Sequence, residues 1–283
     1  MHHSAERQDA ASAFWFSPFD MIGWTLVMSL AFGVIGLPPA AATPAILFIS
    51  FLAIFQHANL RTPRWLGYVV QRPESHTIHH ARGVHATAGL HPNDLPDPWE
   101  PAFHRIEALV RGGGFVAVGE TGLDYFRTDE AGRGVQHDSF RWHIRLAREL
   151  GKALVIHDRD AHDDVLTVLE DEGAPERVVF HCFSGDAAMA RYCAERGWFV
   201  SFAGVVTFKN AQPLREALRE VPEQLVLVET DAPYLTPAPH RGRPNASYLM
   251  PLTVRAMAVE RGVTEIAMCR TLWDNAQRAF GAW

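Results

Sequence analysis

From residue 85 onward, short apolar, β-branched runs alternate with amphipathic helical segments. This alternation is typical of parallel strands joined by crossover helices. Because the runs are almost continuously apolar, each strand is expected to be buried on both faces, as in a (β/α) barrel. The predicted fold class is therefore α/β, of the TIM-type (β/α) barrel kind. The six predicted strands are HATAGL (85–90), FVAVGE (115–120), ALVIH (153–157), VVFH (178–181), WFVSFAG (198–204) and LVLVET (225–230).

Two segments between these strands have sequence features typical of helices. Residues 136–150 place Phe140, Ile144 and Leu146 on one side, and residues 161–173 end in Gly173, a residue suited to a helix C-cap. Six strands are two fewer than a closed eight-stranded barrel has. The domain boundary is predicted near residues 84–86, which divides the chain into residues 1–85 and 86–283.

Four of the predicted strands end at a side chain that can bind a metal ion. The carboxyl ends of parallel barrel strands meet at one face, where barrel enzymes place their chemistry. Alone, a strand-end His is more often a satisfied polar group and a Glu often caps a helix, but four together favour a site. Two imidazoles and two carboxylates suit Zn²⁺, Mn²⁺ or similar ions, which activate water and neutralise charge on a phosphoryl oxygen. The predicted ligands are Glu120, His157, His181 and Asp231.

Five motifs from about Ala86 to the C-terminus resemble, in order, the signatures of the TatD-like metal-dependent deoxyribonuclease family. They are ATAGLHPNDL, VGETGLDYF, IHDRDAHDD, FHCFSGD and ETDAPYLTPAPHRGRPN. The resemblance implies a barrel hydrolase that cleaves phosphodiester bonds with one or two divalent ions (Zn, Mn or Mg). It implies that Glu120 bridges the ions and that Asp231 also handles the proton of the attacking water, so both are predicted to be catalytic.

The same resemblance assigns further residues around the site. His91 matches a histidine near the substrate phosphate, while Arg241 and Asn245 match positions where a loop closes over the site. His91 and Arg241 are therefore predicted to bind substrate, although a salt bridge that orders the loop explains Arg241 equally well. Asp124 and Tyr125 are expected to support or pack against the ligands rather than bind metal.

One departure from the family pattern concerns its first strand. In the family this strand carries a His-x-His pair that supplies ligands to one metal, and no apolar strand with such a pair precedes residue 86. The sequence therefore predicts a barrel without its first two strands and a hydrolase impaired by the loss of one metal's ligands.

Between Asp20 and Arg61 the chain has no Asp, Glu, Lys or Arg. Two apolar runs flank PPAAATP, which suggests a helical hairpin turned by prolines. Each run is shorter than the roughly 20 residues that a bilayer-spanning helix needs, so the alternative is a pair of buried helices. Residues 21–56 are predicted to contact a membrane and to anchor a cytoplasmic hydrolase domain.

Residues 55–85 resemble the C-terminal part of the fatty-acid hydroxylase/sterol desaturase family, which are membrane proteins with a di-iron site. The segment HTIHH offers three histidines at a spacing that shares one helix face, and QHAN offers a fourth. The earlier histidine boxes of the family are absent, so the alternatives are iron binding and an inactive remnant. The possible second cluster consists of His57, His76, His79 and His80.

Charge and cysteine content limit the partners. Residues 1–85 carry 5 Lys/Arg and 4 Asp/Glu, whereas residues 86–283 carry 21 and 28, giving net charges of about +1 and −7. An acidic body does not suit broad electrostatic capture of nucleic acid, so a phosphate must be held locally. The three cysteines form no CxxC pair and predict a reducing compartment.

The functional prediction is a TatD-type hydrolase that acts on DNA or a small phosphodiester, with no protein partner implied. The alternatives are a fragment of a membrane di-iron oxygenase and a non-catalytic remnant of a fusion.

Overall fold

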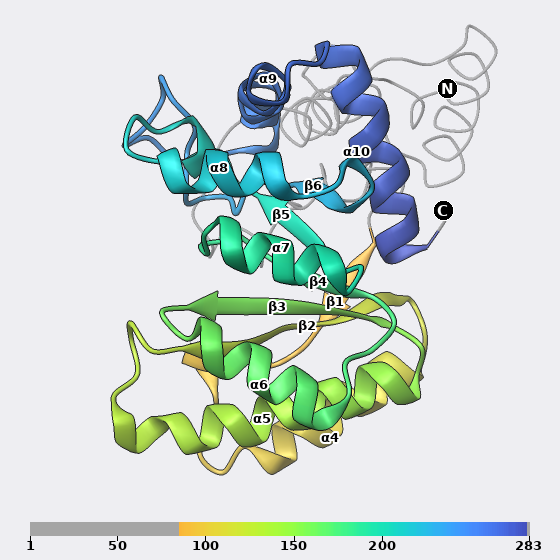
Figure 1. Ribbon diagram of the computed structural model, residues 1–283. Helices are drawn as coiled ribbons and strands as arrows, with labels where there is room; N and C mark the ends of the chain where they lie inside the picture. The colour runs from red at the N-terminus through yellow and green to blue at the C-terminus, as the bar shows by residue number, and fades with distance from the viewer. Residues whose placement is uncertain (1–84, 282–283) are drawn as a thin grey trace, which may run out of the picture. The chain divides into compact units, whose positions relative to one another are not determined.

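Six parallel strands form one sheet in sequence order, β1-β2-β3-β4-β5-β6, in the computed structural model (Figure 1). The structure describes residues 85–281, which belong to a compact unit spanning His85–Trp283. Among the described strands, β1 and β6 are the two edges of the sheet. The strands are β1 (Ala86–Ala88), β2 (Phe115–Asp124), β3 (Ala153–Arg159), β4 (Val178–Phe180), β5 (Phe199–Phe202) and β6 (Val226–Val228).

Helices connect successive strands, as the alternating sequence pattern predicts. In Figure 1, α4, α5 and α6 lie along β2 and β3, and α7 lies beside β4 and β5. The six-stranded parallel sheet with alternating helices is the arrangement of a TIM-type (β/α) barrel, which confirms the predicted fold class. The helices are α4 (Glu100–Arg111), α5 (Glu130–Glu149), α6 (His162–Glu172), α7 (Ala187–Glu195), α8 (Gln212–Glu220), α9 (Met250–Arg261) and α10 (Glu265–Phe280).

The sheet is apolar on both faces, as continuous apolar strands require. One face packs against the connecting helices through the larger core, which includes Leu154, Phe180 and Val200. The alternate residues of the same strands, such as Val179 and Phe199, form a second cluster with Ala279 of α10. Side chains alternate between the faces of a strand, so a three-residue strand such as β4 contributes to both cores.

The strand register places the predicted ligands at the same height. Ile156 of β3 pairs with Phe180 of β4. His157 directly follows Ile156, and His181 directly follows Phe180. The two histidines are therefore at the same height along the sheet. Gly122 of β2 pairs with His157, which brings the carboxyl end of β2 to this edge as well. The prediction that the ligands share one end of the sheet therefore follows from parallel pairing.

A bulge in β2 positions Glu120. Val118 pairs with Leu154 and Thr121 pairs with Ile156, so β2 has one more residue than β3 between these rows. Gly119 has a φ of 139° within this bulge, a conformation that residues with a Cβ rarely adopt. A Cβ on Gly89 would lie 2.6 Å from the Gly119 backbone. These two glycines let the chain after β1 approach β2 closely, two residues before His91.

Element ends differ from the sequence predictions in several places. Strand β2 continues to Asp124 and β3 to Arg159, beyond the predicted ends at residues 120 and 157. Helix α5 begins at Glu130 rather than residue 136, because the Asp129 carboxylate accepts a hydrogen bond from the Gly132 N–H and caps it. The glycines of EAGRG conceal this start, since glycine disfavours helix interiors. Gly173 caps α6 as predicted.

Several predictions lie outside the described residues. They are the membrane contact of residues 21–56 and the second metal cluster of His57, His76, His79 and His80. Within residues 85–281, no helix is long and apolar enough to cross a membrane.

His143 of α5 is a buried histidine that holds the chain just after β1. Its side chain is fully buried, and its Nε2 accepts a hydrogen bond of 3.0 Å from the Leu90 N–H. Its Nδ1 donates to the Ser139 carbonyl at 2.7 Å, so the ring is held in one neutral tautomer. Burial lowers the pKa of His143 to about 4, although the hydrogen bond to Ser139 acts in the opposite direction.

Acid is expected to destabilise the fold through His143. The unfolded chain takes up a proton near pH 6.5, but the folded chain takes it up only near pH 4. The stability is therefore complete above pH 6.5 and falls as the pH drops towards 4, by about 3 kcal/mol. Denaturant unfolding between pH 4 and 7 measures this, and His143→Gln should flatten that part of the curve. The exposed His104→Gln is the matched control, and an equal flattening in that variant would contradict the assignment.

Candidate metal centre

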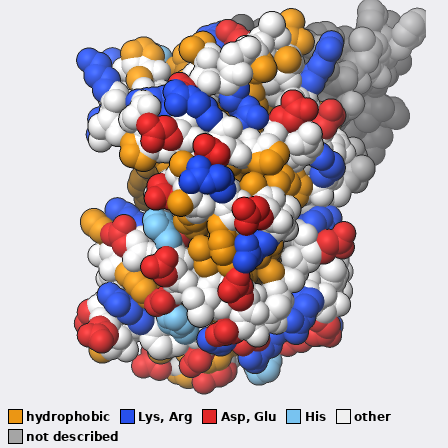
Figure 2. All heavy atoms as spheres, in the orientation of Figure 1, with side chains coloured by type: hydrophobic (Ala, Val, Ile, Leu, Met, Phe, Trp, Pro, Cys, Tyr) orange, Lys and Arg blue, Asp and Glu red, His pale blue; other side chains and the backbone are white. Residues whose placement is uncertain are grey.

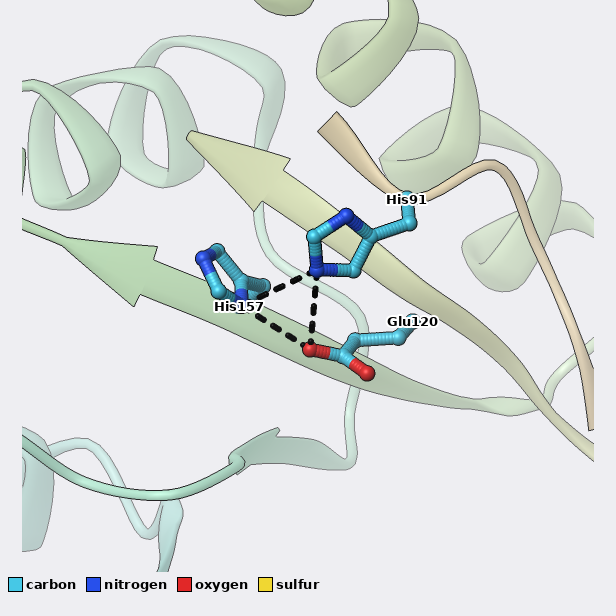
Figure 3. A group of neighbouring side chains, drawn as sticks. All are labelled: His91, Glu120 and His157. Atoms are coloured by element: carbon cyan, nitrogen blue, oxygen red, sulfur yellow. Dashed lines mark hydrogen bonds and ion pairs between the residues drawn. The ribbon is translucent and has the colours of Figure 1, made fainter. Parts of the chain in front are cut away.

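Glu120 of β2, His157 of β3 and His91, which follows β1 by three residues, meet at the carboxyl edge of the sheet (Figure 3). Glu120 Oε1 lies 2.9 Å from His157 Nδ1 and 3.5 Å from His91 Nε2. The two imidazoles face each other, with 3.3 Å between His91 Nε2 and His157 Nδ1. These atoms lie within 4.8 Å of one another, so their spacing alone would allow all three to bind one metal ion.

The other two predicted ligands continue the group across the sheet. His181 Nε2 lies 3.5 Å from Glu120 Oε1 and 3.7 Å from Asp231 Oδ1. Asp231 follows β6 in the left-handed region, with a φ of 54°, which aspartate tolerates better than most residues. Glu120 is therefore central, with a histidine on either side, and Asp231 lies beside the second histidine.

Each ligand histidine is held from behind by a carboxylate. His157 Nε2 donates to Asp124 Oδ2 at 3.0 Å, which leaves Nδ1 facing Glu120. His181 Nδ1 donates to Glu229 Oε2 at 2.9 Å, which leaves Nε2 facing Glu120 and Asp231. Metal-binding histidines commonly donate their other ring N–H to a carboxylate, because this fixes the tautomer and directs a lone pair at the ion.

In neutral His91 the ring nitrogen that faces the centre carries the proton, whereas in neutral His157 and His181 the proton lies on the nitrogen that faces away. Its Nδ1 accepts a hydrogen bond of 3.1 Å from the Asn93 backbone N–H, which can only donate. The proton of a neutral His91 therefore lies on Nε2, the atom that faces Glu120 and His157. In this tautomer His91 donates a hydrogen bond into the site instead of offering a lone pair to a metal. This geometry suits a group that contacts an anionic ligand.

The charges of the centre depend on one another. Burial raises the pKa of Glu120, but hydrogen bonds from His157 and His91 and the charge of His181 outweigh it and hold that pKa well below its usual value. Burial lowers the pKa of His181, but hydrogen bonds with Asp231, Cys182 and Glu229 outweigh it and raise that pKa well above its usual value. Without an ion, a protonated His181 balances the surrounding carboxylates; a divalent cation would take over that task and leave Nε2 free to bind it.

The donor set fits a divalent metal ion. Two inward imidazole nitrogens and the carboxylates of Glu120 and Asp231 are the mixed nitrogen and oxygen ligands that Zn²⁺ or Mn²⁺ accept. A second group, His181, Cys182 and Glu229, is also compact enough for an ion. Burial raises the pKa of the Cys182 thiol well above its usual value, and the thiolate is the form that binds metal. The set of Glu120, His157, His181 and Asp231 is therefore the better metal site.

The carboxylates behind the histidines give a testable prediction. Asp124→Asn and Glu229→Gln should each weaken Zn²⁺ or Mn²⁺ binding by about 10- to 100-fold. The reason is that His157 and His181, respectively, would lose the carboxylate that orients the ring. Isothermal titration calorimetry measures this affinity, and circular dichroism checks the fold. Asp171→Asn, at an exposed carboxylate paired with Arg141, is the control. Folded variants with the affinity of the unchanged protein would refute the supporting role.

The loop residues from the sequence prediction have different surroundings. The Arg241 guanidinium lies over the Phe208 ring, 4.4 Å from its centroid, and makes no ion pair with any residue between 85 and 281. Asn245 is buried and donates to the carbonyls of Thr230 and Tyr234, so it ties the loop after Asp231 together. The salt-bridge alternative for Arg241 does not hold in the described part of the chain.

Glu229 is the supporting residue that the sequence prediction missed. Its carboxylate also accepts hydrogen bonds from the Cys182 N–H at 2.6 Å and the Ser201 hydroxyl at 2.8 Å. Burial raises the pKa of Glu229, but the hydrogen bond and charge of His181 outweigh it, so the pKa is lowered. The signal in the sequence was its spacing, since Glu229 precedes Asp231 by two residues and residues at that spacing share one side of an extended chain.

Comparison with known proteins agrees with this geometry. The family described as TatD related DNase matches residues 72–281. The chain belongs to the TatD family. A metal-dependent hydrolase named TatD from Mycobacterium tuberculosis is 49% identical over 206 residues, which cover 71% of this chain and 77% of the relative. The metal-dependent hydrolase YcfH of Escherichia coli is 40% identical over 195 residues, which cover 69% and 72%.

Solved structures of TatD proteins share the fold. The TatD homolog YJJV of Escherichia coli superposes with a TM-score of 0.66 at 24% identity, covering 73% of this chain and 80% of that one. A TatD family hydrolase of Entamoeba histolytica gives 0.60 at 16% identity, with coverage of 77% and 78%. The predicted TatD-type, metal-dependent hydrolase is thereby confirmed at that level. A fatty acid hydroxylase family matches residues 1–93, as the second resemblance predicted.

Proposed function

We propose that this TatD protein hydrolyses phosphodiester bonds, in DNA or in a small phosphodiester. The observation that supports it best is the opposed polarity of the histidines. His157 and His181 are held so that each can direct a lone pair at a cation in the centre, while His91 directs an N–H into it, where an anion would bind. A phosphate ester bound to a metal ion is such an anion. Zn²⁺, Mn²⁺ or Mg²⁺ would activate water and neutralise charge on the phosphoryl oxygens.

The roles of the chain's own residues follow from their positions. Glu120 and Asp231 would supply the negative charge that holds the cation, and His157 and His181 would supply its nitrogen ligands. Asp231 is 32% exposed at the side chain, so it can exchange a proton with water at the edge of the centre. His91 donates to a phosphoryl oxygen and orients the ester.

The charge distribution limits how a nucleic acid could bind. Figure 2 shows basic and acidic side chains mixed over the helical face of the described unit, without a continuous basic stripe. The whole chain has a formal net charge of −6. Such a surface gives little long-range attraction to DNA, so binding must come from contacts at the site itself. We therefore infer that short single strands or small diesters suit this protein better than long duplexes.

The proposal is tested with purified full-length protein, made metal-free and then supplied with Zn²⁺, Mn²⁺ or Mg²⁺. Cleavage of a labelled single-stranded DNA and of a p-nitrophenyl phosphodiester should appear with metal and vanish with chelator. A phosphomonoester and a carboxylic ester serve as substrate controls. Metal-dependent turnover of the carboxylic ester alone would replace the phosphodiester assignment with another hydrolase activity.

A further inference from the structure

A cavity of about 470 Å³ opens beside the metal centre. Its walls come from the segment after His91, from the chain after β2 and from the first turns of α5. This volume is within the range of about 300–1,000 Å³ that small-molecule sites occupy. The residues that matter for its chemistry are Asn93, Leu95, Trp99, Arg127 and Gln136.

The cavity and the metal centre share a wall. Asn93 lines the cavity, and its backbone N–H donates to His91 Nδ1. Its side-chain amide donates to Asp124 Oδ2 at 2.7 Å, and Asp124 holds His157. A group in the cavity therefore lies one residue layer from the atoms that hold the metal and orient the phosphate.

The floor of the cavity is rigid. Gln136 is buried, accepts from the Asp124 N–H at 2.9 Å, and donates to the Pro92 carbonyl at 3.1 Å and the Thr128 hydroxyl at 2.8 Å. Both polar atoms of this side-chain amide are engaged by the protein, so Gln136 offers shape rather than a hydrogen bond to a ligand. This part of the cavity can therefore contact a ligand only through packing.

The walls combine an aromatic ring with an exposed cation. Trp99 is half-buried, and its indole packs edge-on against Phe103 at 4.2 Å between ring centroids. The Arg127 guanidinium is exposed and forms no ion pair or side-chain hydrogen bond within residues 85–281. An aromatic wall beside an exposed arginine is the combination that binds a nucleobase and its phosphate.

We propose that this cavity is a nucleoside subsite, which takes the base and sugar next to the phosphodiester bond that the metal centre cleaves. This inference rests on the proposed phosphodiesterase function and adds the part of the substrate that is recognised. Trp99 packs against the base, and Arg127 pairs with the next phosphate along the strand. Recognition is tolerant of base identity, because every base has a flat face and the Gln136 amide is already occupied.

Two substrates with the same leaving group test the subsite. Thymidine 5′-(p-nitrophenyl phosphate) carries a base and sugar, whereas methyl p-nitrophenyl phosphate carries neither. The unchanged protein with Mn²⁺ should prefer the thymidine ester in kcat/KM. Trp99→Leu should lower kcat/KM for the thymidine ester by about 10-fold, chiefly through KM, and leave the methyl ester unchanged.

Unchanged turnover of the methyl ester also shows that Trp99→Leu folds correctly. Trp273→Leu, which changes an exposed tryptophan of α10, is the matched control and should affect neither substrate. Equal losses on both esters, or no loss on either, would overturn the subsite.

A binding measurement separates the subsite from the proposed function. If neither ester is cleaved with any metal, the phosphodiesterase proposal fails, and calorimetry with thymidine 3′,5′-bisphosphate, which carries a phosphate on each side of the sugar, then decides the subsite alone. Weaker binding to Trp99→Leu and to Arg127→Gln than to Trp273→Leu supports the nucleoside subsite. Equal binding to all three variants overturns it.

Discussion

Glu120→Gln is expected to abolish most metal-dependent hydrolysis, with a fall in kcat of about 10²- to 10³-fold. Glu120 is the side chain that contacts His91, His157 and His181 at once, so it holds the centre together. Glutamine has nearly the same shape but lacks the negative charge that a divalent ion needs. The centre would then keep its histidines and lose its central anionic ligand, which should also weaken metal binding.

The measurement combines turnover of a p-nitrophenyl phosphodiester with calorimetric titration of Mn²⁺ or Zn²⁺. Glu107→Gln removes an equal charge at a surface carboxylate paired with Arg111 and is the control. Both variants should remain folded at the assay temperature, because neither change removes a buried apolar contact. Full activity in a metal-loaded Glu120→Gln protein would remove Glu120 from the centre and contradict the proposed mechanism.

The second large effect concerns the number of metal ions. The TatD-like pattern places a His-x-His pair on a first strand, and no such pair precedes residue 86. The inward ligands among the described residues are Glu120, His157, His181 and Asp231, which suffice for one well-held ion. We expect one tightly bound ion per chain. Two ions would stabilise one transition state together, so a second ion is expected to raise the rate of hydrolysis by about 10²-fold or more over that with one ion.

Restoring the missing pair tests this expectation. A chimera with a family-like first βαβ unit ahead of Ala86 should bind two ions per chain and cleave DNA faster. The same chimera with both added histidines changed to alanine is the control, because it restores the strands without the ligands. Metal content is measured by mass spectrometry beside DNA cleavage. Two ions and equal cleavage in the unmodified chain would show that the first strand's histidines are dispensable here.

Much of the fold can be predicted from the sequence because the information is local. Apolar runs interrupted by amphipathic stretches predict parallel strands and crossover helices, and β1 to β6 occupy all six predicted positions. Parallel strands end at one edge, so strand order alone predicts that strand-end residues such as His157 and His181 lie together. Strand ends are less well predicted, since the extension of β2 to Asp124 depends on pairing with β3.

The supporting residues cannot be assigned from the sequence with the same security. Asp124 and Glu229 act through hydrogen bonds to His157 and His181 on other strands, and a lone carboxylate in the sequence carries no record of its partner. Arg241 is a similar case, because its position over Phe208 results from the path of a long loop. Side chains on loops depend on tertiary contacts more than on sequence spacing.

The sequence by itself determined the fold class and four strand-end side chains with metal-binding chemistry, because periodicity and parallel pairing leave few alternatives. The family followed from the resemblance of five ordered motifs. The tertiary structure alone decided how these groups work together. The bulge at Gly119 turns Glu120 into the centre, and the Asn93 N–H makes His91 a donor rather than a ligand. It also placed the cavity lined by Trp99 beside the metal centre. These features depend on register and on close approach between distant segments, which local sequence patterns do not encode.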